Sequence, residues 1–111
     1  MNKLKTIFIG SGEFSIPILK KILEIDFLDL VAVVTQPNKP VGRKQVLTPT
    51  PLGIYLEEIG IKALKPEKIS TQSLADYKPD IILVASYGQI IPLEILRILL
   101  VLIAIIIVIS Y

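Results

Sequence analysis

The sequence predicts an α/β fold, a Rossmann-like open parallel sheet built from βαβ units. Short apolar runs rich in isoleucine and valine alternate along the chain with segments whose apolar residues recur at helical spacing. The clearest run, residues 80–86, is apolar on both faces, which is typical of a central parallel strand. About four strands are expected. A full Rossmann-like sheet has six strands, so this sheet is expected to be incomplete. The apolar end of the chain is a candidate for a makeshift further strand.

The first βαβ unit occupies the N-terminal third of the chain. Residues 5–9 form the first expected strand, which Gly10 ends. Ser15 is the expected N-cap of a helix beginning near Ile16–Pro17, because serine accepts hydrogen bonds from first-turn amides and proline is tolerated there. Residues 28–34 form the second expected strand. Its connection to the first is therefore expected to be a right-handed crossover.

A proline-rich loop follows this strand directly, with the sequence TQPNKPVGRKQVLTPTP over residues 35–51. Its four prolines exclude a helix, and its charged residues are Lys39, Arg43 and Lys44. A long loop without secondary structure inside a compact domain is usually either functional or disordered. Its stiffness and positive charge indicate a surface for an anionic partner; the alternative is an ordinary solvated surface.

The remaining elements complete the parallel sheet. A helix is expected from Thr50–Pro51 to residue 59, with Gly60 at its C-terminus. A third strand is expected over residues 61–64, one or two helical turns over residues 70–77, and a fourth strand over residues 80–86. Ligands of such sheets bind beyond the carboxyl ends of the strands. The turn after the first strand, the long loop and residues 87–92 should therefore meet at one edge.

Composition excludes several kinds of site. The 111 residues are enough for one domain and contain neither cysteine nor histidine. Disulfides, cysteine nucleophiles and imidazole bases are thus excluded, and no metal site is expected. The formal net charge of +2 is too small to indicate nucleic-acid binding by itself, so any basic signal is local. The N-terminus lacks the apolar core of a signal peptide, and a cytoplasmic location is expected.

The end of the chain is unusually apolar. Residues 98–109, ILLVLIAIIIVI, carry no charge, but the run is shorter than the roughly 20 residues that a membrane-spanning helix needs. Its isoleucines and valines favour a strand. We expect it to cover the open edge of the fourth strand or to drive self-association. A tail anchor is the alternative, and no other contact with a membrane is expected.

The turn that starts at Gly10 has two possible interpretations. Gly10-x-Gly12 after a strand is the beginning of a dinucleotide-binding motif, but Ser15 stands where that motif has its third glycine. No acidic residue ends the second strand to hold a ribose. A simple strand-to-helix turn is the favoured interpretation, although its backbone amides remain able to contact a phosphate.

Two long stretches resemble the methionyl-tRNA formyltransferase family. They are IFIGSGEFSIPILKKIL and VAVVTQPNKPVGRKQVLTPTPLGIYLEEIGI, the second of which is similar to that family's Thr-Gln-Pro…Gly-Arg loop. The segments LKPEKI and KPDIILVASYGQIIPLEIL continue the resemblance. It divides the chain into residues 1–96, the N-terminal part of the formyltransferase domain, and residues 97–111, a tail that does not match.

The resemblance implies a Rossmann-like transferase of translation initiation that moves a formyl group from 10-formyltetrahydrofolate to the amino group of initiator methionyl-tRNA. It implies that the loop contacts the acceptor end of the tRNA, chiefly through Arg43, supported by Lys39 and Lys44. It also implies an active-site turn at Gly10, Gly12, Glu13 and Phe14. The folate pocket would be lined, largely by backbone groups, at Tyr87, Gly88, Gln89, Ile90 and Ile91.

The sequence also departs from this family. Ser11-Gly12 stands in place of Thr-Pro, and the loop reads Gly-Arg-Lys-Gln where the family often has Gly-Arg-Gly-Lys-Lys. The family's catalytic Asn-x-His should begin soon after Leu96 and a catalytic Asp should follow, but apolar residues stand there. No catalytic residue is therefore assigned, and an inactive fragment is expected. The alternatives are a non-catalytic RNA-binding module and half of a sugar-amine formyltransferase, and the basic loop argues against the second.

Overall fold

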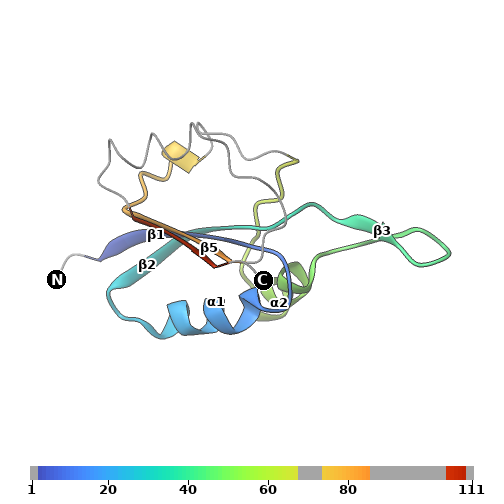
Figure 1. The fold of residues 1–111 in the computed structure, drawn as a ribbon, viewed down its shortest axis with the longest axis horizontal. Coiled ribbons are helices and arrows are strands. Elements are labelled where there is room, and N and C mark those ends of the chain that lie inside the picture. The colour runs from blue at the N-terminus through green and yellow to red at the C-terminus, as the bar shows by residue number, and fades with distance from the viewer. Residues whose placement is uncertain (1–2, 68–73, 86–104, 110–111) are drawn as a thin grey trace.

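The computed structural model describes residues 3–67, 74–85 and 105–109. Their secondary structure follows the predicted alternation of strands and helices, with two additional short strands after β2 (Figure 1). In chain order the elements are β1 (Leu4–Gly10), α1 (Ser15–Glu24), β2 (Leu28–Val34), β3 (Lys39–Val41), β4 (Val46–Thr48), α2 (Pro51–Ile59), β5 (Ile81–Ala85) and β6 (Ile105–Ile109).

The main sheet has the order β2-β1-β5-β6, and every neighbouring pair in it is parallel. β1 lies inside the sheet and is buried from Thr6 to Gly10. The chain runs from β1 through α1 to β2, and then crosses to β5 on the other side of β1. This arrangement confirms the predicted Rossmann-like α/β fold with an incomplete parallel sheet.

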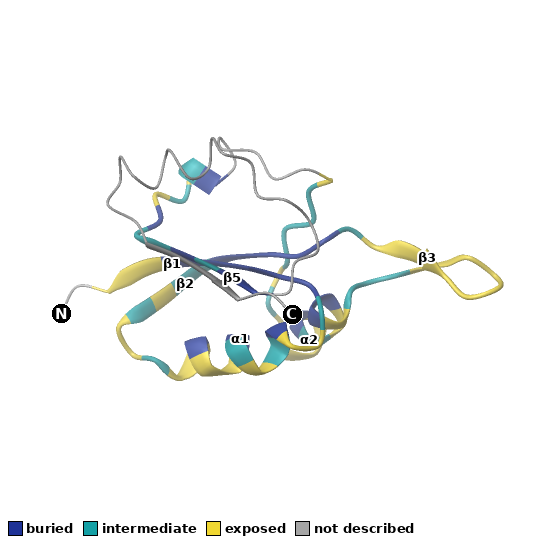
Figure 2. Ribbon diagram, in the orientation of Figure 1, coloured by how far each residue is buried: buried dark blue, intermediate teal, exposed yellow. Residues whose placement is uncertain are grey.

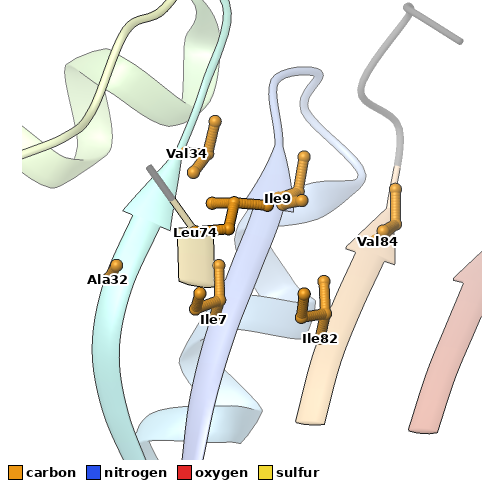
Figure 3. Packing of buried hydrophobic residues seen from close by; sticks show 7 residues of the cluster. All are labelled: Ile7, Ile9, Ala32, Val34, Leu74, Ile82 and Val84. Atoms are coloured by element: carbon orange, nitrogen blue, oxygen red, sulfur yellow. The ribbon is translucent and has the colours of Figure 1, made fainter. Parts of the chain in front are cut away.

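Both faces of the sheet are covered, and successive strand residues alternate between two clusters. One cluster packs strand residues against Leu74 of a short helical turn (Figure 3). The other lies on the face that α1 and α2 cover, where Phe8 packs with residues of both helices. Burial of one such side chain contributes about 1.5–3 kcal/mol. The buried members of the first cluster are Ile7, Ile9, Ala32, Val34, Leu74, Ile82 and Val84; those of the second are Phe8, Leu19, Ile22, Val33, Leu52, Leu56 and Ala85.

The third strand predicted over residues 61–64 does not form as an element. Only an isolated parallel bridge joins Leu64 to Val34, through hydrogen bonds from the Leu64 N–H to the Val33 carbonyl at 2.8 Å and from the Thr35 N–H to the Leu64 carbonyl at 3.0 Å. Pro66 lacks a donor and restricts the residue before it, which limits pairing to this one point. The bridge lies on the side of β2 that faces away from β1. Of the helical turns predicted at 70–77, residues 74–75 are helical, and residues 70–73 lie outside the described part of the chain.

The helix ends agree with the sequence at α2 and differ at α1. Thr50 caps α2 by accepting a hydrogen bond from the Gly53 N–H, and Gly60 ends it in the left-handed conformation, at a φ of 78°. Ser15, the expected cap of α1, is instead its first residue, and the cap position belongs to Phe14. The reason is that Ser15 is buried and its hydroxyl donates back to the Gly12 carbonyl of the preceding turn.

β6 tests the expectation for the apolar tail. Its five residues pair with β5 in parallel register, from Ile81 opposite Ile105 to Ala85 opposite Ile109. The prediction that the tail covers the edge of this strand is confirmed for residues 105–109, and the rest of the tail lies outside the described residues. Among the helices of the described chain, none has the length and apolar character needed to cross a membrane.

Candidate functional site

The prolines of residues 35–51 suggested a loop without secondary structure. The segment instead folds into a hairpin. β3 and β4 pair in antiparallel fashion, with Lys39 opposite Thr48 and Val41 opposite Val46. Gly42 and Gln45 take left-handed φ angles of 76° and 51°, and the Gln45 N–H and Nε2 both donate to the Gly42 carbonyl, at 3.2 and 2.9 Å. The proline within β3 is compatible with the hairpin because both strands are sheet edges.

The three predicted cations lie on this hairpin and are exposed. Lys39 begins β3, and Arg43 and Lys44 occupy the turn between the strands. Residues 35–51 contain no acidic side chain, and within the described part of the chain none of the three cations joins an ion pair. The hairpin projects beyond α2, away from the sheet (Figures 1 and 2). Positive charge is therefore concentrated on a protruding surface of a nearly neutral chain.

The hairpin has no core of its own. Its larger apolar side chains are open to solvent, with exposed fractions of 54% for Val41, 58% for Val46 and 66% for Leu47. An isolated two-stranded hairpin is at best marginally stable in water. Its direction relative to the sheet therefore depends on the contacts at its base.

A chain of three hydroxyl groups forms that base. The Thr50 and Thr35 Oγ1 atoms are 2.6 Å apart, and Thr35 Oγ1 donates to Ser11 Oγ at 3.3 Å. In the shorter contact either threonine hydroxyl can be the donor. Thr50 Oγ1 in turn accepts from the Gly53 N–H at 3.0 Å, and Ser11 Oγ accepts from the Gln36 N–H at 3.1 Å. The turn after β1, the end of β2 and the start of α2 are thus joined at one point.

Two more hydrogen bonds support this junction. The Leu52 N–H donates to the Ser11 carbonyl at 3.0 Å, and Lys65 Nζ donates to Asn38 Oδ1 at 2.9 Å beside the start of the hairpin. Sequence reasoning assigned no role at the site to Ser11, Thr35 or Thr50. The available signal was a threonine at each end of the proline-rich segment, one at a strand end and one before a helix.

The predicted active-site turn lies at the carboxyl edge of β1, beside the junction. Gly10 pairs with Ala85 of β5. A Cβ atom on Gly10 would lie 2.8 Å from both the Ala85 carbonyl oxygen and the Ser15 Cβ, so only glycine fits there. Glu13 and Phe14 are exposed on the turn. The prediction for this turn named Gly10, Gly12, Glu13 and Phe14. The side chain that joins the turn to the hairpin base belongs instead to Ser11, which the prediction did not include.

The residues predicted to line a folate pocket, Tyr87, Gly88, Gln89, Ile90 and Ile91, lie outside the described residues. β5 ends at Ala85 beside Gly10, so the chain leaves β5 at the edge where the first turn begins. Of the three segments expected to meet at this edge, the first turn and the hairpin base do so. Among the described residues, no group of three or more acidic, cysteine or histidine side chains is placed to hold a metal ion.

Comparison with known proteins places the chain in a family. The family described as formyl transferase matches residues 4–107. Similar curated proteins are the methionyl-tRNA formyltransferases of Bacillus cytotoxicus, 47% identical over 98 residues, and of Bacillus thuringiensis and Bacillus cereus, each 45% identical over 98 residues. These alignments cover 85% of this chain and 31% of each relative, so the chain spans about a third of their length. The sequence match and the parallel sheet agree, and the chain belongs to the formyl transferase family.

Proposed function

We propose that this chain provides the tRNA-binding hairpin of a methionyl-tRNA formyltransferase. The observation that carries the proposal is the hairpin itself: three exposed cations on a segment that contains no acidic residue, on a protrusion held at the carboxyl edge of the sheet. Arg43 is the principal contact to the acceptor end of initiator methionyl-tRNA, and Lys39 and Lys44 support it.

The chemistry of these side chains suits a nucleic-acid backbone. The Arg43 guanidinium offers a planar set of donors that matches a phosphate with two hydrogen bonds, whereas a lysine acts as a point charge. Each phosphate that a cation neutralises releases counterions, which makes binding strongly dependent on salt. Because the hairpin is exposed, its cations reach an RNA without displacing other parts of the protein.

The transfer reaction requires catalytic groups in addition to the cations of the hairpin. Moving a formyl group from 10-formyltetrahydrofolate to an amine requires proton transfer and stabilisation of the oxyanion that forms at the carbonyl. The chain contains no histidine, the side chain that most often transfers protons in enzymes, and the family resemblance assigns no catalytic residue to it. We therefore infer that the 111 residues alone do not catalyse formyl transfer. We also propose that residues 87–91 contribute backbone groups to the folate pocket of the enzyme, and that the enzyme acts in the cytoplasm.

Two measurements on the purified chain test the proposal. Equilibrium binding to a fluorescent initiator tRNA transcript should be detectable at low salt and should weaken steeply as salt rises. A formylation assay with methionyl-tRNA and 10-formyltetrahydrofolate should give no product above the background without protein. Absence of salt-dependent tRNA binding would refute the binding role, and formyl transfer above background would refute the inferred inactivity.

A general RNA-binding module is the second candidate, because the hairpin requires no folate site to hold RNA. The two candidates differ in specificity. A hairpin that belongs to a methionyl-tRNA formyltransferase should prefer initiator over elongator tRNA, whereas a general module should bind both equally at matched salt. Half of a sugar-amine formyltransferase remains disfavoured, because a nucleotide-sugar substrate does not require this cationic hairpin.

A further inference from the structure

The hydroxyl chain at the hairpin base is buried and joins segments that are distant in the sequence. Thr35 is fully buried and Ser11 is 7% exposed. The three hydroxyls are linked in the order Thr50, Thr35, Ser11, and Ser11 Oγ accepts both the Thr35 hydroxyl and the Gln36 N–H. It joins residues that are 24 and 15 positions apart in the sequence.

Its position determines what it can control. Thr35 is the first residue after β2 and Thr50 the last before α2, so the two ends of the hairpin segment meet through these hydroxyls. Beyond them, residues 38–47 are exposed. The direction of the hairpin is therefore set at this junction and not by packing along its strands.

We propose that the hydroxyl chain Thr50–Thr35–Ser11 positions the hairpin for RNA binding. This inference rests on the proposed function and adds positioning residues that touch no RNA themselves. A hairpin held in the bound direction loses less conformational entropy when it binds. Removing the Thr35 hydroxyl should therefore weaken binding while leaving every cation in place.

The test compares two isosteric changes at fully buried threonines. Thr35→Val removes the central hydroxyl of the chain. Thr6→Val removes the hydroxyl of a threonine within β1 that donates only to the Leu4 carbonyl, at 3.0 Å, away from the hairpin. Thr35→Ser restores the hydroxyl and serves as the rescue variant. The probe is a fluorescein-labelled initiator tRNA transcript, titrated with the full chain from about 50 to 200 mM KCl.

The expected result separates positioning from stability. Thr35→Val should raise the Kd about five- to tenfold, which corresponds to the cost of ordering about one further side chain. The slope of log K against log salt should stay unchanged, because the number of phosphate contacts is the same. Thr35→Ser and Thr6→Val should stay within about twofold of the parent. If Thr35→Val binds as tightly as Thr6→Val, the inference is overturned.

Two further variants keep the result decisive. Should Thr35→Val fail to fold, Ser11→Ala takes its place, with Ser15→Ala as the control at another buried serine, whose hydroxyl donates only to the Gly12 carbonyl. The same predicted loss and the same overturning result apply. Arg43→Ala is measured in parallel. If it leaves tRNA binding unchanged, the proposed function itself fails; if it weakens binding while the hydroxyl variants do not, only the positioning role fails.

Discussion

The Oγ1 atoms of Thr35 and Thr50 lie 2.6 Å apart, although 15 positions separate the two residues in the sequence. Their hydrogen bond joins the end of β2 to the start of α2 and closes the segment between them into a hairpin with a fixed base. The hairpin thereby presents Lys39, Arg43 and Lys44 from the rigid edge of a parallel sheet. Binding residues carried by a loop on a rigid scaffold are a common arrangement in proteins.

The cations of the hairpin turn should account for the salt dependence of tRNA binding. Arg43→Ala and Lys44→Ala should each weaken binding and reduce the magnitude of the salt slope by about one. Lys62→Ala is the matched control, because Lys62 is also exposed but lies after α2. Salt titrations of tRNA binding measure the effect. Equal slopes for Lys44→Ala and Lys62→Ala would show that the hairpin turn does not contact phosphates.

Thr50 should also contribute to stability as a helix cap. Thr50→Ala removes the acceptor of the Gly53 N–H and the hydroxyl that bonds Thr35, and loss of such a cap costs about 0.5–2 kcal/mol. Thr48→Ala removes only an exposed bond to the Val46 carbonyl and should cost less. Urea unfolding of both variants gives the comparison. A larger loss for Thr48→Ala would be inconsistent with this role of Thr50.

Gly10 should tolerate no side chain. Alanine there would place its Cβ 2.8 Å from the Ala85 carbonyl and the Ser15 Cβ, and overpacking of this kind costs about 1–3 kcal/mol. Gly42→Asn is the contrasting change, because space around Gly42 is open and asparagine accepts its left-handed φ of 76°. The thermal midpoint should fall clearly only for Gly10→Ala. Equal midpoints for the two variants would contradict the close packing at Gly10.

The pairing of β6 with β5 can be tested with two neighbouring prolines. Successive residues of a strand direct their N–H groups to opposite sides, so only one of Ile106 and Ile107 can donate to β5. Ile106→Pro and Ile107→Pro should therefore differ, and one of them should speed amide exchange in β5 much more than the other. If both leave exchange in β5 unchanged, β6 does not pair there in solution.

The sequence was sufficient to predict the sheet and most element ends. Alternation of apolar runs located β2 at residues 28–34, and Thr50 and Gly60 marked both ends of α2. The error at α1 arose because Ser15, a residue typical of a cap, is buried and its hydroxyl donates to the Gly12 carbonyl of the preceding turn. The third strand predicted over residues 61–64 is a similar case, because Pro66 limits its pairing with β2 to the single bridge at Leu64.

The candidate site was predictable only in part. Lys39, Arg43 and Lys44 were found because charge and proline content are local properties of a sequence. The hairpin was not, since its turn depends on a left-handed Gln45, a conformation that is rare outside glycine and asparagine. The hydroxyl chain was missed because the partners Ser11, Thr35 and Thr50 are distant in the sequence and meet only when the sheet and α2 are assembled.

The most direct test of the hairpin as a tRNA contact is site-specific photo-crosslinking. A benzophenone side chain replaces Leu47 on the hairpin, which is 66% exposed, or Phe27 just before β2, which is 56% exposed. The first should crosslink to nucleotides at the acceptor end of initiator tRNA, and the second should give no comparable product. Equal crosslinking from the two positions, or crosslinks from Leu47 that avoid the acceptor end, would contradict the proposed role of the hairpin.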